Sequence, residues 1–83
     1  MAEVHRERGF TFHVYSNDHQ PAHIHVKKDG GEIKIDICDK DEANLLCIKA
    51  KMSSADISKA LDIADANIKK FRKKWEEYHG SID

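Results

Sequence analysis

Four short runs of the chain predict the strands of a half-buried β-sheet, and apolar and polar residues alternate in the first three of them. The runs span about 10–15, 23–28, 32–38 and 44–49. Their core-facing positions in the first three runs are aromatic or β-branched: Phe10, Phe12, Val14, Ile24, Val26, Ile33, Ile35 and Ile37. Residues 1–9 are polar and charged, and we expect a loosely held lead-in with room for a short strand around Val4.

The turn between the second and third runs fixes their register. Asp29-Gly30 is a strong signal for a two-residue hairpin, and this turn would place Lys27 opposite Glu32. Moving the turn by one residue would place Lys27 opposite Lys34 instead. Opposite charges across two strands stabilise the pair and like charges destabilise it, by roughly 0.2–1 kcal/mol. The sequence therefore favours the Asp29-Gly30 turn.

The apolar spacing changes to steps of three and four residues in the last third of the chain, which predicts one long helix over about 54–79. Ser53 or Ser54 would cap its start, and Gly80 would end it. Its apolar stripe comprises Ile57, Leu61, Ala64, Ile68, Phe71, Trp75 and Tyr78. The predicted fold is one α+β domain over 1–83, an antiparallel meander of three to four strands with this helix packed on the Phe/Val/Ile face.

Composition narrows the class of protein. The chain has 83 residues, of which 40% are hydrophobic and 35% charged, as expected of a small globular domain with a single core. It has neither an apolar run long enough for a membrane span nor a signal peptide, so we expect a cytoplasmic protein. Cys38 and Cys47 lie outside any CxxC motif and are expected to be reduced residues of the core or of a strand.

The candidate chemistry is concentrated in the segment 16–26, Ser-Asn-Asp-His-Gln-Pro-Ala-His-Ile-His-Val. Its first part is a loop by composition. The loop residues that we single out are Ser16, Asn17, Asp18 and Pro21, with His19 among them. The strand alternation places His13, Tyr15, His23, His25, Lys34 and Asp36 together on the sheet face opposite the helix. We expect that face to be open to solvent.

Four interpretations of this face remain open. The histidines could be incidental residues of a solvated surface, or the face could recognise a partner or ligand. A metal site would use two or three of His13, His19, His23 and His25, with zinc or another divalent transition metal, although the spacing matches no standard zinc motif. An enzyme would use His23 or His25 for acid–base chemistry such as RNA cleavage, with Lys34 steadying an anion and Asp36 fixing the His23 tautomer.

A second candidate surface lies on the predicted helix, where Lys69, Lys70, Lys73 and Lys74 face away from the apolar stripe. Such lysines are usually solvated, and contact with an RNA backbone is the functional alternative. The 14 basic and 15 acidic residues give a net charge of −1. This balance argues against a protein that binds nucleic acid over its whole surface.

Residues 16–26 resemble the signature of the domain of unknown function 4160 family of small bacterial proteins, Ser-Asn-Asp/Glu-His-x-Pro-x-His-hydrophobic-His. The likeness extends from the aromatic strand before the motif to Phe71, Trp75 and His79. Members of that family are largely uncharacterised, and some are suspected members of toxin–antitoxin pairs. The resemblance thus implies a small partner protein encoded nearby, with the histidine motif as the active or binding surface. The alternatives are a small protein that binds a divalent metal and a non-catalytic interaction module.

Overall fold

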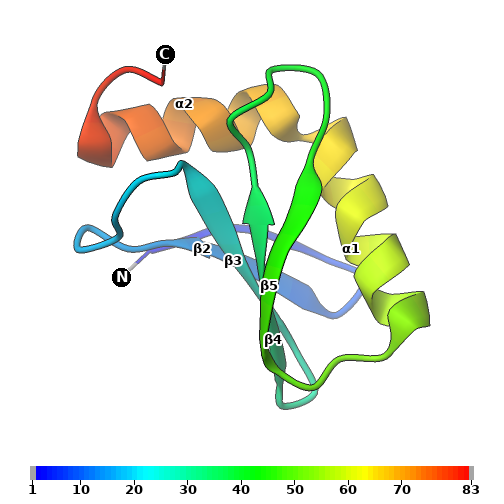
Figure 1. Cartoon of the computed structure of the whole chain (residues 1–83). Coiled ribbons are helices and arrows are strands. Elements are labelled where there is room, and N and C mark those ends of the chain that lie inside the picture. Colours follow the sequence, from blue (N-terminus) through cyan, green and yellow to red (C-terminus); the bar gives the residue numbers. More distant parts are fainter. Residues whose placement is uncertain (1, 83) are drawn as a thin grey trace.

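The computed structural model describes residues 2–82, which form one antiparallel sheet of five strands and two helices (Figure 1). The elements are β1 Ala2–Glu7, β2 Phe10–Val14, β3 His23–Lys28, β4 Gly31–Asp36, β5 Asn44–Ala50, α1 Ser54–Ala66 and α2 Ile68–His79. The strands lie in the sheet in chain order. The α+β class and the antiparallel meander are confirmed, whereas the expected three to four strands and single helix are corrected to five strands and two helices.

The additional strand is β1, in the segment that we expected to be a loose lead-in with room for a short strand around Val4. Arg8 and Gly9 form the tight turn that joins it to β2, with φ angles of 53° and 82°. Two consecutive positive φ angles match the right-handed twist of the flanking strands, and glycine reaches this conformation without steric cost. Because β1 lies at the edge of the sheet, it needs little apolar alternation of its own.

The β3–β4 hairpin has the predicted register. Asp29 and Gly30 occupy its turn with φ angles of 49° and 83°. Lys27 lies opposite Glu32, and Val26 opposite Ile33. The strand bounds predicted from the sequence are close to those in the structure, although β2 ends at Val14 and β4 spans Gly31–Asp36.

Asn67 divides the predicted helix into α1 and α2. Its side-chain amide donates to Ile63 O, and its backbone N–H bonds to the carbonyls of Ile63 and Ala64. With φ −119° and ψ 18°, it is both the last cap of α1 and the first cap of α2. Asparagine commonly replaces helical hydrogen bonds with local side-chain bonds of this kind. The bend lets α1 and α2 follow different directions over the twisted sheet (Figure 1).

Both helices contribute to the core on the predicted Phe/Val/Ile face of the sheet. Ala60, Ile63, Ala64, Ile68, Phe71 and Trp75 are buried with the apolar residues of β2, β3 and β4. The ring of Phe71 stacks on that of Phe12, with 5.2 Å between the ring centroids. Ile57 and Leu61 are only partly buried, and Tyr78 is 46% exposed, so the apolar stripe was predicted slightly too wide.

Strand β5 is the other edge of the sheet and differs from the inner strands in its exposure. Leu45, Leu46 and Ile48 have 40%, 40% and 52% of their surface exposed. Cys47 on this strand and Cys38 before it are free thiols, and Cys47 is a strand residue, as predicted. Both are exposed, so neither belongs to the core. Neither helix in the part of the chain that the structure describes has the length and apolar character needed to cross a membrane.

Candidate functional site

The histidine face of the sheet is covered, which corrects the expectation that it is open to solvent. His13, His23 and His25 are only 7%, 4% and 5% exposed. Aromatic rings lie against two of these histidines. The ring of Tyr15 lies 4.5 Å from that of His25, and the ring of Trp75 lies 5.2 Å from that of His23.

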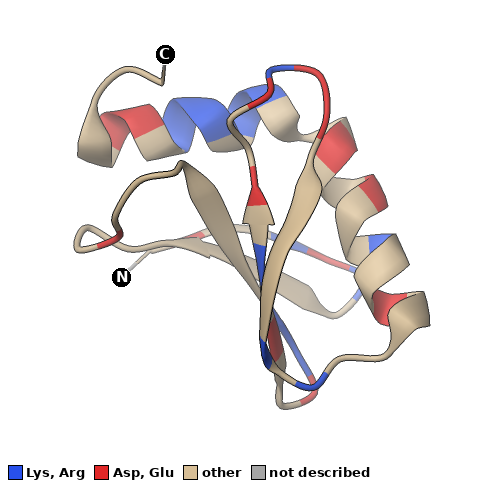
Figure 2. Ribbon diagram, in the orientation of Figure 1, with Lys and Arg blue, Asp and Glu red and all other residues tan. Residues whose placement is uncertain are grey.

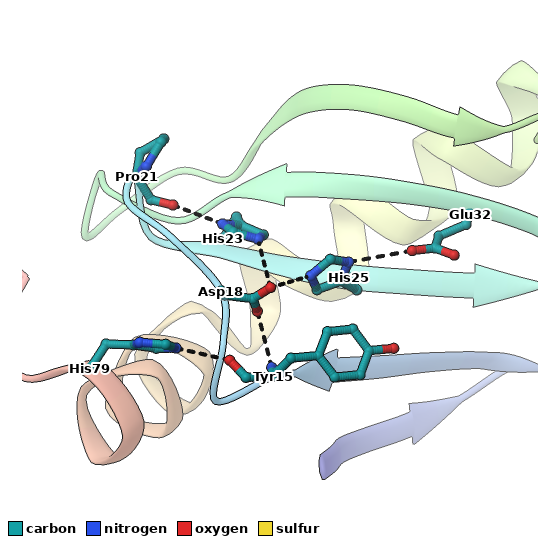
Figure 3. Close-up of polar contacts among 7 residues, drawn as sticks. All are labelled: Tyr15, Asp18, Pro21, His23, His25, Glu32 and His79. Carbon is teal, nitrogen blue, oxygen red and sulfur yellow. Dashed lines mark hydrogen bonds and ion pairs between the residues drawn. The ribbon is translucent and has the colours of Figure 1, made fainter. Parts of the chain in front are cut away.

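Asp18 is held over this face by the turn that follows β2 (Figure 3). Its backbone N–H donates to Tyr15 O at 3.1 Å, and Tyr15 N–H donates to Asp18 Oδ2 at 3.0 Å. The other carboxylate oxygen, Oδ1, faces the histidines and lies 2.8 Å from His25 Nε2 and 3.5 Å from His23 Nε2.

The protonation state of Asp18 follows from these contacts. Burial opposes its charge and would raise the pKa, but the hydrogen bonds from His25 and from Tyr15 N–H outweigh burial. Its pKa therefore lies below the ordinary value, and Asp18 is a carboxylate at neutral pH.

His23 is fixed in one tautomer. Its Nδ1 lies 2.8 Å from Pro21 O, and since a carbonyl only accepts hydrogen bonds, Nδ1 carries the proton. Burial is the main cause that lowers the pKa of His23, so the neutral ring is favoured. In a neutral ring Nε2 then has a lone pair and no proton. This buried nitrogen has no hydrogen-bond partner among the described residues, and it faces the Asp18 carboxylate.

His25 lies between two carboxylates. Its Nε2 is 2.8 Å from Asp18 Oδ1, and its Nδ1 is 3.3 Å from Glu32 Oε2 (Figure 3). A neutral imidazole carries one proton and can donate to only one of the two. Metal-binding histidines commonly have this arrangement, in which one nitrogen donates to a carboxylate or carbonyl while the other coordinates the ion.

Asp18, His23 and His25 thus direct one ligand atom each toward a common point. These three atoms all lie within 4.8 Å of one another. Ligand atoms around a tetrahedral zinc ion, with bonds of about 2.0–2.1 Å, are roughly 3.4 Å apart. The distances from Asp18 Oδ1 to the two histidine Nε2 atoms, 2.8 and 3.5 Å, lie on either side of that value. The three side chains could therefore hold a divalent ion after small movements.

The cluster lies in the wall of a pocket of about 350 Å³. The lining residues are Tyr15, Asn17, Asp18, His19, Gln20, Pro21, His23, His25, Glu32, Lys34, Leu46 and Lys49. They come from the β2–β3 loop and from strands β3, β4 and β5. Small-molecule sites commonly begin at this size, so the pocket has room for a ligand beside the cluster.

Two histidines of the predicted metal set lie outside the cluster. His13 is opposite His25 in the sheet as expected, but its Nε2 hydrogen-bonds to Thr11 Oγ1 at 2.8 Å. Burial is the main cause that lowers the pKa of His13. His19 is exposed and lines the pocket without joining the three ligand atoms.

Of the predicted catalytic set, His23, His25 and Lys34 line the pocket. Asp36 lies opposite His23 in register, as expected. However, its Oδ1 accepts a hydrogen bond from Cys38 N–H, so the His23 tautomer is fixed by Pro21 O instead.

In the predicted loop set, Ser16 and Asn17 are exposed, and Asn17 lines the pocket. Asp18 contributes a carboxylate to the cluster, and Pro21 contributes the carbonyl that holds His23. The loop residues thus take different parts in the site.

Sequence reasoning missed three supporting residues. Glu32 shares the strand alternation of Lys34 and could have been placed on the histidine face by that signal. Trp75 was assigned to the core, where it is fully buried, yet its ring also contacts His23. His79 Nε2 donates to Tyr15 O at 3.0 Å, and the periodicity of the sequence does not predict this contact.

The basic residues of α2 form the band visible in Figure 2. Lys69 and Lys73 are exposed, whereas Lys70 Nζ lies 3.0 Å from His5 Nδ1 and Lys74 pairs with Glu77. Arg72 donates to backbone carbonyls. These contacts agree with solvated lysines, and RNA binding by Lys69, Lys70, Lys73 and Lys74 stays a prediction.

The fold and the site together define a small α+β protein with a carboxylate–histidine cluster buried beside a pocket on its sheet. A family model described as "Domain of unknown function (DUF4160)" matches residues 9–76. The chain therefore belongs to this family, as its motif predicted. The comparisons with curated proteins and with solved structures gave no match.

Proposed function

We propose that this protein binds a divalent transition metal ion through Asp18 Oδ1, His23 Nε2 and His25 Nε2. One observation carries the proposal. The unprotonated Nε2 of His23 is buried and faces the Asp18 carboxylate at 3.5 Å, so two electron-rich atoms meet without a proton between them. A buried polar atom without a partner is costly, and a cation between these two atoms removes the cost.

The surrounding hydrogen bonds favour metal binding over acid–base catalysis. Pro21 O holds the proton of His23 on Nδ1, which leaves Nε2 of that ring to coordinate. Glu32 faces Nδ1 of His25 and can accept its proton there, so that a metal ion can replace the Nε2 proton that bonds to Asp18. A general acid or base needs a nitrogen that exchanges protons with a substrate. At 4–5% exposure, with the Nε2 atoms directed at Asp18, His23 and His25 are poorly placed for that exchange.

The donor set indicates the kind of metal. Two imidazoles and one carboxylate suit zinc, iron, nickel and copper better than magnesium or calcium, which prefer oxygen ligands. Three protein ligands leave at least one coordination position of a zinc ion for water or another ligand. The pocket beside the cluster gives that position access to small molecules.

The direct test compares the melting temperature of the protein with and without metal. At a free metal concentration of 100 times Kd, binding stabilises the folded state by about 2.7 kcal/mol. For a domain of this size that corresponds to a rise in Tm of roughly 10–20 °C. The rise should be larger at pH 8 than at pH 5.5, because protonated imidazole cannot coordinate. The metals to test are zinc, nickel, copper and cobalt.

Matched variants separate the site from nonspecific binding. His25→Gln and Asp18→Asn should each lose most of the rise in Tm. His19→Ala removes an exposed histidine of the same loop that lies outside the cluster, so it should respond to metal like the wild type. Equal melting temperatures with and without all four metals at both pH values would refute the proposal, as would an undiminished response in both His25→Gln and Asp18→Asn.

A second candidate function is binding of a small partner protein, as in a toxin–antitoxin-like two-gene module. The observation that favours it is the edge strand β5, where Leu45, Leu46 and Ile48 are each at least 40% exposed. An unpaired strand edge offers backbone N–H and C=O groups to a strand of another chain. Exposed leucine and isoleucine side chains would add apolar contact.

The second candidate predicts a small protein encoded beside this gene, and coexpression of the two chains tests it. We expect the two chains to copurify at a fixed ratio and Ile48→Lys to disrupt the complex. Tyr78→Lys introduces the same charge at an exposed apolar residue of α2 and should leave the complex intact. Copurification that survives Ile48→Lys would rule out β5 as the contact surface.

A further inference from the structure

Two lysines lie in the wall of the same pocket as the carboxylate–histidine cluster. Lys34 on β4 is opposite His25 in the sheet, and Lys49 lies on the neighbouring strand β5. Neither ammonium group forms an ion pair within residues 2–82. Two cations without ion-pair partners, next to the proposed metal site, would favour a negatively charged ligand in this pocket.

The charge of the pocket wall supports this conclusion. The charged lining residues are Asp18, Glu32, Lys34 and Lys49, and their formal charges cancel. A bound divalent ion would therefore leave a surplus of two positive charges. Such a surplus in a partly enclosed site strongly favours an anionic ligand.

The geometry permits one ligand to meet both the metal and the lysines. The cluster leaves a coordination position open, and the pocket volume of about 350 Å³ is at the lower end of the range for small-molecule sites. Lysine binds phosphate as a compact point charge, and metal ions commonly coordinate phosphate oxygens. A phosphate monoester carries between 1.5 and 2 negative charges at pH 7, close to the surplus, whereas a carboxylate carries one.

We propose that the pocket binds a small phosphate monoester, with one phosphate oxygen on the metal ion and the others contacting Lys34 and Lys49. This proposal rests on the metal site of the proposed function. It adds the chemical class of the ligand and assigns a role to Lys49, which sequence reasoning did not single out. Lys34 acts as the anion-binding group that the sequence suggested, but for a ligand held on a metal.

The experiment uses the cobalt-loaded protein, because the visible spectrum of bound Co²⁺ changes when a ligand enters its coordination sphere. Phenyl phosphate is the probe and benzoate is the carboxylate control, both titrated at pH 7.5. We expect phenyl phosphate to change the cobalt spectrum and to bind at least tenfold more tightly than benzoate. The dissociation constant of cobalt is measured separately for every variant.

The lysine variants test the two anion contacts. Lys34→Gln and Lys49→Gln should each weaken phenyl phosphate binding about tenfold or more and leave cobalt binding within about threefold of wild type. Lys34→Arg keeps the charge and should retain most of the affinity. Lys59→Gln removes an exposed lysine of α1 outside the pocket and should change neither constant.

The outcomes distinguish the two proposals. Absence of a cobalt spectrum would refute the metal site, and the phosphate proposal would fall with it. Cobalt binding with no response to phenyl phosphate, or a response that is unchanged in both Lys34→Gln and Lys49→Gln, would overturn only the phosphate proposal. Equal affinity for benzoate would also overturn it, because the ligand class would then be carboxylates.

Discussion

Replacing Phe71 by alanine tests the central packing contact between helix and sheet. Phe71 is fully buried, and its ring stacks on Phe12 at a centroid distance of 5.2 Å. Truncation of a buried phenylalanine costs about 3–5 kcal/mol, through lost burial and the cavity that remains. An 83-residue domain has a total stability of about 4–12 kcal/mol. Phe71→Ala should therefore remove a large share of it and lower Tm by roughly 12 °C or more.

Urea unfolding followed by circular dichroism measures the free energy of unfolding of each variant. Tyr78→Ala, a truncation at an exposed position of the same helix, is the control and should change stability by no more than about 0.5 kcal/mol. A double-mutant cycle between Phe12→Leu and Phe71→Leu should give a coupling of about 0.5–1.5 kcal/mol. A cost of Phe71→Ala below about 1 kcal/mol, or an additive cycle, would refute the stated packing of α2 on the sheet.

Three further predictions concern stability. Burial is the main cause that lowers the pKa values of His13 and His23, so the unfolded chain binds protons at a higher pH than the folded one. The stability of the metal-free protein should therefore be full above about pH 6.5 and fall as the pH drops below it. Urea unfolding at pH 7.5 and 5.5 in EDTA measures the loss, which should be smaller for His13→Gln. Gly31→Ala would place a Cβ atom 2.6 Å from Lys51 O and should cost about 1–3 kcal/mol in thermal melts, whereas an unchanged Tm would contradict this close approach. Ser53→Ala removes the side-chain acceptor at the start of α1, and chemical denaturation should show a loss of about 0.5–2 kcal/mol.

The sheet register could be predicted from the sequence because short-range signals determine it. Asp29-Gly30 selects the turn, and the Lys27–Glu32 pair selects the alignment. Strand β1 has no comparable signal. Val4 of that strand packs against the core as a partly buried apolar residue, and the His5 ring lies against the rings of Phe12 and Phe71. The strand is otherwise paired with β2. The division at Asn67 was also missed, because the apolar stripe of the helices continues on both sides of it.

The sequence predicted which segment holds the candidate site, but not how its side chains come together. Strand alternation places a side chain on one face of a sheet and says nothing about what covers that face. His23 and His25 were expected in solvent, yet the loop that contains Asp18 folds back over them through contacts with Tyr15. These loop contacts are local, but the contacts of Trp75 with His23 and of His79 with Tyr15 join distant parts of the chain and depend on the tertiary structure.

The hydrogen bond from His79 to Tyr15 O has a consequence for the newly made chain. Translation delivers Asp18 and His25 early, but His79, which braces the turn that carries Asp18, is added 54 residues after His25. Trp75, whose ring lies against His23, arrives nearly as late. A nascent chain on the ribosome therefore holds all three candidate ligands before it holds the side chains that support them. The finished geometry of the cluster therefore depends on α2, whose supporting side chains are synthesised well after the candidate ligands.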